Sequence, residues 1–122
     1  MEKQIKDTIE KLIHFPYDYR TRENVSPIAL LNESGYVENS NLISEVEIEE
    51  ILNLYPDSIN EWLLWSENKR TAKGWLFTRD EDDGWCFVGY FPESKEFEEI
   101  NTKDVFKACA AFVKREAEYL RN

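Results

Sequence analysis

The chain has 122 residues, with 25 acidic and 15 basic side chains and a formal net charge of −10. This length fits a single domain over residues 1–122, and it suffices to bury a core without disulfide or metal support. The acidic balance argues against nucleic acid and anionic membrane surfaces as partners, because both attract basic patches. A basic partner fits the charge better.

The sequence also indicates a cellular compartment. Met1 leads directly into a charged amphipathic pattern rather than a signal peptide, and no apolar run approaches the length of a membrane span. Cys86 and Cys109 lie among apolar neighbours, on a predicted strand and a predicted helix, so we expect free buried thiols. These features predict a cytoplasmic protein.

Residues 2–14 are predicted to form the first helix, because apolar side chains recur at helical spacing until Pro16, which is expected to end it. His14 is the one histidine of the chain. It has no visible nucleophile or acid partner, so we interpret it as a cation at the helix C-terminus. Residues 17–24 are expected to form a surface loop, and residues 27–31 favour an extra edge strand, where a leading proline is tolerated.

A middle helix is predicted after a polar loop over residues 32–41. Ser44 and Glu47 match a capping box, in which the serine accepts from a backbone amide and the glutamate reaches back. The expected buried stripe consists of Val46, Ile48, Ile51, Leu52 and Tyr55. Pro56 closes this helix, whose carboxylates scatter around it and therefore indicate a solvated face rather than metal or acid–base chemistry.

The stretch from Trp62 to Phe91 contains all four tryptophans of the chain. Its three apolar runs, Trp62–Trp65, Trp75–Phe77 and Trp85–Phe91, are predicted to be strands. They are rich in aromatic residues, too short for helices, and bounded by polar or glycine-containing segments. The aromatic side chains could form a binding platform, but we favour a core, because aromatic residues dominate core burial.

Residues 80–84 are predicted to connect the last two runs as a hairpin, with Gly84 at positive φ. The length of this loop decides which side chains share a face, because a slip of one residue moves every side chain to the other face. A two- or four-residue loop groups Trp75 and Phe77 with Cys86, Val88 and Tyr90. A three-residue loop groups them with Trp85, Phe87 and Phe91. We prefer the three-residue loop because it makes one strongly apolar face.

Residues 97–100 are a candidate fourth strand of a meander. The longest helix is expected to follow, capped by Asn101 or Thr102 and ending near Leu120. Its expected core stripe consists of Phe106, Cys109, Ala110, Val113, Ala117 and Leu120, with Phe112 off the stripe. The predicted fold class is therefore α+β, with an antiparallel sheet of about four strands packed with an N-terminal, a middle and a long C-terminal helix.

The chain offers no catalytic constellation. An EF-hand is excluded, because setting Gly84 as the loop glycine puts Arg79 and Tyr90 at the first and last ligand positions. A looser divalent-ion site at the hairpin tip stays open. No glycine-rich loop could cradle a phosphate, and neither cysteine has a histidine nearby to activate a thiolate. We predict no enzyme activity, no cofactor and no catalytic residue.

Two acidic clusters remain as candidate partner-binding residues. The first is Asp80, Glu81, Asp82 and Asp83 at the hairpin tip, and the second is Glu93, Glu96, Glu98 and Glu99 after the following strand. One interpretation is solubility and protection of a sheet edge. The other is a negative surface that steers a basic partner into association.

The format of this chain resembles the small immunity proteins of bacterial polymorphic toxin systems, including contact-dependent growth inhibition. The resemblance lies in a short acidic α+β chain with tryptophan-rich segments such as WLLWSEN and GWLFTRDEDDGWCFVGYF. It implies a cytoplasmic inhibitor that binds one cognate toxin domain, often a nuclease, and covers its active site or substrate path. The alternative is a non-catalytic intracellular adaptor or small-ligand-binding module.

Overall fold

The computed structural model describes residues 1–69, 73–92 and 96–121 of the chain. The helices are α1 (Lys3–Ile13), α2 (Phe15–Thr21), α3 (Pro27–Ser34), α4 (Tyr36–Asn39), the 3-10 helix η1 (Ser40–Leu42), α5 (Glu45–Leu52), α6 (Ser58–Asn68) and α7 (Val105–Arg121). The strands are β1 (Gly74–Arg79), β2 (Cys86–Phe91) and β3 (Ile100–Thr102), in the antiparallel order β1-β2-β3. The α+β class is confirmed, but the described residues form three strands rather than about four.

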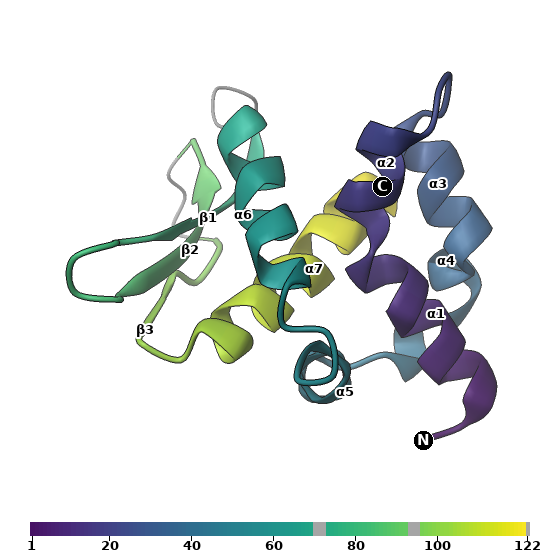
Figure 1. Ribbon diagram of the computed structural model, residues 1–122, viewed down its shortest axis with the longest axis horizontal. Coiled ribbons are helices and arrows are strands. Elements are labelled where there is room, and N and C mark those ends of the chain that lie inside the picture. Colours follow the sequence, from purple (N-terminus) through teal and green to yellow (C-terminus); the bar gives the residue numbers. More distant parts are fainter. Residues whose placement is uncertain (70–72, 93–95, 122) are drawn as a thin grey trace.

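The long helix α7 lies at the centre of the molecule. The sheet is on one side of it and the N-terminal helices α1 to α4 are on the other (Figure 1). Helix α7 contacts all three strands and also α3, α5 and α6. One continuous core therefore extends from the N-terminal helices through α7 to the inner face of the sheet.

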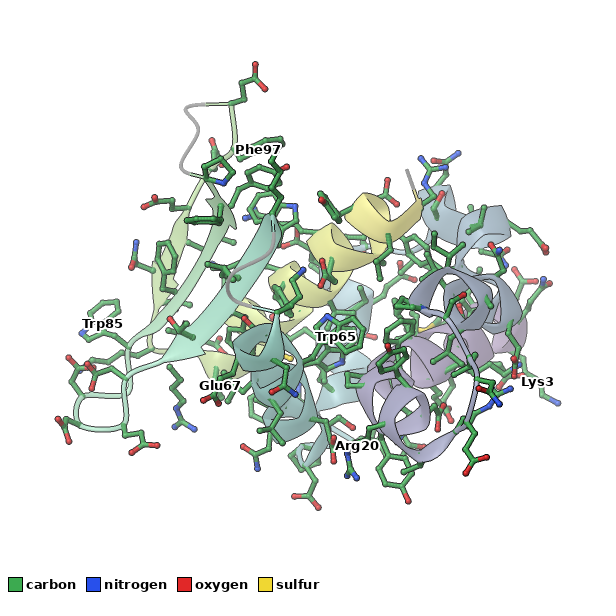
Figure 2. All side chains as sticks on the ribbon, turned by 90° about the horizontal axis from the view of Figure 1, so that it is seen from above. Lys3, Arg20, Trp65, Glu67, Trp85 and Phe97 are labelled. Atoms are coloured by element: carbon green, nitrogen blue, oxygen red, sulfur yellow. The ribbon has the colours of Figure 1, made fainter. Side chains whose placement is uncertain are left out.

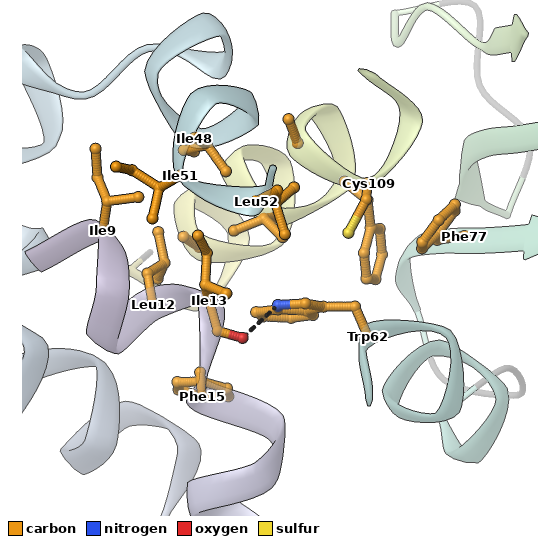
Figure 3. Close-up of a cluster of buried hydrophobic side chains, with 14 of the residues drawn as sticks. Ile9, Leu12, Ile13, Phe15, Ile48, Ile51, Leu52, Trp62, Phe77 and Cys109 are labelled. Atoms are coloured by element: carbon orange, nitrogen blue, oxygen red, sulfur yellow. Dashed lines mark hydrogen bonds between the residues drawn. The ribbon is translucent and has the colours of Figure 1, made fainter. Parts of the chain in front are cut away.

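Trp62 of α6 joins the two halves of this core. Its indole ring stacks on Phe15 at 5.9 Å between ring centroids and meets Phe112 edge-on at 5.8 Å. The indole Nε1 donates a hydrogen bond to the Ile13 carbonyl at 3.0 Å, so the buried N–H is satisfied (Figure 3). Phe112 in turn packs against Phe77 of β1 at 5.5 Å.

The prediction of a strand over Trp62–Trp65 is wrong, because this run lies within α6. The buried residues Ile59, Trp62 and Ser66 are three and four residues apart, which is the spacing of one helix face. Leu64 points outward and is 50% exposed. A four-residue apolar run fits a buried strand or a buried helix equally well, so its length could not decide between them.

The predicted surface loop over residues 17–24 is helical as far as Thr21, and residues 22–24 alone lie outside a helix. The chain leaves α1 at His14 and enters α2, which continues to Thr21. Pro16 stands in the first turn of α2, where its missing N–H is not needed for an intrahelical bond. Pro16 therefore lies inside the first turn of α2, after the break between the two helices at His14.

The predicted edge strand over residues 27–31 is helix α3 instead. Ser26 Oγ accepts a hydrogen bond from the Ala29 amide at 3.0 Å, and Pro27 occupies the first turn. Gly35 ends the helix in the left-handed conformation at φ 86°. These are start and stop signals of a helix, and they override the strand-like composition. The predicted loop over residues 32–41 is likewise largely helical, since it contains α4 and η1.

The middle helix is confirmed as α5, but it ends at Leu52 rather than at Pro56, so the half-buried Tyr55 lies beyond it. Ser44 and Glu47 form the predicted capping box, with the Ser44 Oγ accepting from the Glu47 amide at 3.2 Å and the Glu47 carboxylate accepting from the Ser44 amide at 3.1 Å. The predicted stripe members Ile48, Ile51 and Leu52 are buried. Val46 is not part of the stripe, since 67% of it is exposed.

The hairpin is confirmed, but its preferred register is not. Phe77 pairs with Val88, and Arg79 pairs with Cys86. The Asp80 amide donates to the Trp85 carbonyl at 2.8 Å, so the loop between them has four residues. The face that meets α7 therefore carries Trp75 and Phe77 with Cys86, Val88 and Tyr90. Helix α7 supplies Phe112 to this face, so the core does not need the larger aromatic set.

Gly84 has the predicted positive φ, at 78°, and a Cβ atom placed on it meets nothing within 4 Å. Replacing Gly84 with valine should therefore destabilise the fold by about 1 kcal/mol or more through backbone conformation alone, because β-branched residues disfavour this region. Gly84→Asn is the matched control, since asparagine tolerates the left-handed conformation. Equal midpoints for the two variants in urea denaturation would contradict this turn.

The C-terminal elements begin later than expected. Strand β3 covers Ile100–Thr102 rather than residues 97–100. Helix α7 begins at Val105 and is capped by Asp104, whose Oδ1 accepts from the Lys107 amide at 3.1 Å, rather than by Asn101 or Thr102. Of the expected stripe, Cys109, Ala110, Val113 and Ala117 are buried. Phe112, expected off the stripe, is fully buried, whereas Phe106 and Leu120 are only half-buried.

Candidate interaction surface

The loop between β1 and β2 projects from the end of the sheet (Figure 1). All four of its carboxylates, those of Asp80, Glu81, Asp82 and Asp83, are exposed. Asp80 Oδ1 accepts from the Asp82 amide at 2.8 Å and from the Asp83 amide at 3.3 Å. Asp83 Oδ1 accepts from the Trp85 amide at 2.9 Å. The acidic side chains therefore hold the loop in shape and also present negative charge to solvent.

The second predicted cluster lies on the segment that leads into β3. Glu93 falls outside the described residues, and Glu96, Glu98 and Glu99 are exposed. The Glu98 carbonyl accepts from Arg115 Nη1 at 3.0 Å, which ties the segment to α7. Phe97 packs on Tyr90 with 4.3 Å between ring centroids, so the same segment is held against the sheet.

The structure does not bring the two acidic clusters together. The tip adjoins the end of the hairpin where Arg79 pairs with Cys86, whereas Phe97 packs near the end where Gly74 pairs with Phe91. Figure 2 shows Phe97 and Trp85 at opposite ends of the sheet. The two clusters therefore flank the sheet instead of forming one patch.

Basic side chains near the tip reduce its charge only in part. Arg79 ends β1, and Lys103 Nζ lies 5.5 Å from the centroid of the Trp85 ring. The loop carries four carboxylates against these two cations, so the tip keeps an excess of negative charge. A basic group approaching from solvent meets this excess first.

Aromatic side chains lie exposed on the outer face of the sheet, which faces away from α7. Trp85 is 46% exposed and Phe91 is 45% exposed, and Phe87 between them is half-buried. The sequence alone did not indicate this surface, because the predicted three-residue loop turns these three residues toward the core. The alternative four-residue loop places them on the opposite face from Trp75 and Phe77, which is the outer face.

Two open cavities are relevant to small ligands. One of about 440 Å³ lies between α2 and α6, where Arg20 and Glu61 form a two-point ion pair with N–O distances of 2.6 and 3.0 Å. The other, of about 640 Å³, lies beside α7 and is lined by aromatic residues that include Trp75, Tyr90 and Tyr119. The Arg115 guanidinium stands over the Trp75 ring at 4.9 Å.

A buried ion pair lies next to the first cavity and was not predicted. Glu116 of α7 is fully buried, and its Oε2 accepts from Lys69 Nζ at 2.5 Å and from Trp65 Nε1 at 2.7 Å. Its other oxygen, Oε1, has no hydrogen-bond partner among the described residues. The pair links the C-terminal end of α6 to α7. The helical spacing of apolar residues in the sequence does not predict it.

Both cysteines of the chain are buried, and its one histidine lies at the C-terminal end of α1. Cys86 and Cys109 are free and buried, as predicted, and burial raises the pKa of both thiols, so neither is an activated nucleophile. His14 caps α1, and its Nδ1 lies 2.7 Å from the Glu10 carbonyl. Across the described ranges, no three His, Cys, Asp or Glu side chains are grouped so that they could hold a metal ion. In the same part of the chain, every helix is too short or too polar to cross a membrane.

The fold and surface define an acidic α+β protein whose hairpin presents carboxylates and aromatic rings to solvent. Comparisons with protein families, with curated proteins and with solved structures found nothing that matches this chain.

Proposed function

We propose that this chain is an immunity protein, which binds a cognate bacterial toxin domain in the cytoplasm and neutralises it by covering a basic active-site or substrate surface. The observation that carries the proposal is the projecting hairpin tip, where Asp80, Glu81, Asp82 and Asp83 are all exposed. The net charge of −10 supports it as well.

The tip suits such a role because its shape is set before binding. Asp80 and Asp83 each accept hydrogen bonds from amides of their own loop, so the loop needs little further ordering when a partner arrives. A nuclease must attract phosphate with lysine and arginine side chains. A projecting acidic tip can occupy the same cleft, and its charge accelerates the encounter.

The small-ligand alternative has one observation in its favour. The cavity of about 640 Å³ beside α7 falls within the size range of small-molecule sites, and Trp75, Tyr90 and Tyr119 give it aromatic walls. Under this alternative, the chain should bind a small aromatic or aliphatic compound without any toxin domain. Chemical-shift changes confined to these residues during compound titration would favour it.

If the proposal holds, we expect an adjacent upstream gene whose product ends in a toxin-like domain, and the binding test uses that domain in purified form. We expect a dissociation constant in the nanomolar range and an association rate that falls steeply with ionic strength, because the tip steers a basic partner. No binding at low salt would refute the inhibitor proposal.

A quadruple variant separates steering from contact. The substitutions are Asp80→Asn, Glu81→Gln, Asp82→Asn and Asp83→Asn. Together they should slow association by about tenfold or more at low salt. The amide oxygens of asparagine at positions 80 and 83 can still accept the loop hydrogen bonds, so the fold should remain. The loss should shrink as salt rises and the Debye length falls from about 10 Å at 0.1 M to about 3 Å at 1 M.

The matched control removes the same charge from the opposite end of the molecule. Its substitutions are Glu2→Gln, Asp7→Asn, Glu23→Gln and Glu38→Gln, all at exposed positions in the N-terminal half. This control should slow association much less, because steering depends on charge near the contact. An equal loss in both variants, measured by stopped-flow association kinetics, would move the interface away from the hairpin.

A further inference from the structure

The outer face of β2, together with Trp85 directly before the strand, carries an aromatic stripe. Trp85, Phe87 and Phe91 lie two and four residues apart, so they point to the same side of the sheet. At about 3.3 Å per residue the stripe is roughly 20 Å long. The inner face of the same strand packs on α7, and Figure 2 shows Trp85 on the far side of the sheet from the helices.

Phe87 makes this stripe flat. A Cβ atom placed on Gly89 would lie 2.4 Å from the Phe87 ring, so the ring lies down over the glycine. Because Gly89 has no side chain, the Phe87 ring covers the space between Phe87 and Phe91, and no other side chain protrudes there. A flat aromatic surface on a sheet loses little side-chain entropy when a partner covers it.

The position of Trp85 points to the chemistry of the partner. The residue directly follows the acidic loop, and the Lys103 ammonium already lies 5.5 Å from its ring. The ring is thus placed to attract cations, while the loop carboxylates supply the opposing charge. An arginine or lysine of a partner could pack its stem on Trp85 and direct its charge to Glu81 or Asp82.

We propose that Trp85, Phe87 and Phe91 form the apolar centre of the surface that binds a basic protein partner, with Trp85 as its anchor residue. The proposal rests on the proposed function and specifies its interface. Exposed aromatic residues on a sheet can also stack on the bases of single-stranded nucleic acid. The four carboxylates beside Trp85 oppose that, because they repel phosphate.

The test measures dissociation of the toxin domain encoded by the neighbouring gene from the full chain and its variants. Trp85→Ala should raise the dissociation rate by about 30-fold or more, as central aromatic residues of interfaces do, with little change in the salt dependence of association. Phe91→Ala should have a smaller effect in the same direction. Leu64→Ala is the matched control, because Leu64 is half exposed on α6 and should leave dissociation unchanged.

Each outcome decides the proposal. Circular dichroism first shows that the variants are folded, and Trp85→Phe should restore much of the lost residence time. If the wild-type chain binds and Trp85→Ala dissociates no faster than Leu64→Ala, the aromatic stripe is not the centre of the interface. The proposed function then stands without it. If the wild-type chain does not bind, both fail. Tight binding of a single-stranded oligonucleotide that Trp85→Ala abolishes would also overturn the protein partner.

Discussion

Phe112→Ala should lower the free energy of unfolding by about 3–5 kcal/mol, through lost transfer energy and the cavity left behind. Phe112 is fully buried at the junction of α6, α7 and β1, where its ring meets Trp62 at 5.8 Å and Phe77 at 5.5 Å. Few neighbours at this junction can move into the space, because three separate elements border it.

Phe106→Ala is the matched control on the same helix. Phe106 is half-buried, so water already reaches part of its ring and its removal leaves a smaller cavity. Urea denaturation of both variants should show a clearly smaller loss for Phe106→Ala. Equal losses would mean that α7 presents a different face to the core.

Lys69→Met should also destabilise the fold strongly, by about 3 kcal/mol or more. The substitution keeps the length of the side chain but leaves the fully buried Glu116 carboxylate without its cation. Trp65 Nε1 would remain as the single hydrogen-bond donor that the described residues supply to this carboxylate.

Two controls show whether the loss comes from the uncompensated charge. The double variant Lys69→Met/Glu116→Gln should recover most of the stability, because neither charge is then buried. Arg22→Met removes one partner of the exposed pair between Arg22 and Glu33 and should have little effect. If Lys69→Met costs no more than Arg22→Met in thermal and urea unfolding, the buried pair does not contribute as described.

Local signals in the sequence were sufficient for several elements. The capping box of Ser44 and Glu47 predicted α5 because both hydrogen bonds depend on residues three positions apart. The hairpin followed from two aromatic runs around Gly84. Helix α3 could also have been predicted, because Ser26 caps its N-terminus and Gly35 ends it in the left-handed conformation. The apolar composition of residues 27–31 outweighed those signals in the prediction.

Tertiary packing decided what the sequence could not. The run Trp62–Trp65 is helical because α6 must bury one face between α2 and α7, and a short apolar run carries no period that would reveal this. Phe112 belongs to the core because α7 is covered on several sides and buries a wider arc than one stripe. The register of the hairpin depended on the number of loop residues, which composition alone left open.

The candidate surface was predictable in part. The exposed tip followed from the run of acidic residues at 80–83, since such a run cannot be buried. The separation of this tip from Glu98 and Glu99 could not be predicted, because it depends on how Phe97 packs against Tyr90. The exposed aromatic stripe could not be predicted either, because the face on which Trp85, Phe87 and Phe91 lie depends on the number of residues in the hairpin loop.

The most direct measurement of the central claim is the survival of cells that produce the toxin domain encoded by the neighbouring gene. Co-production of the wild-type chain should restore growth. A folded variant that combines Trp85→Ala with the four neutralising changes at the tip should not restore it, whereas the control variant with four changes in the N-terminal half should. Growth arrest in the presence of abundant wild-type chain would contradict the account.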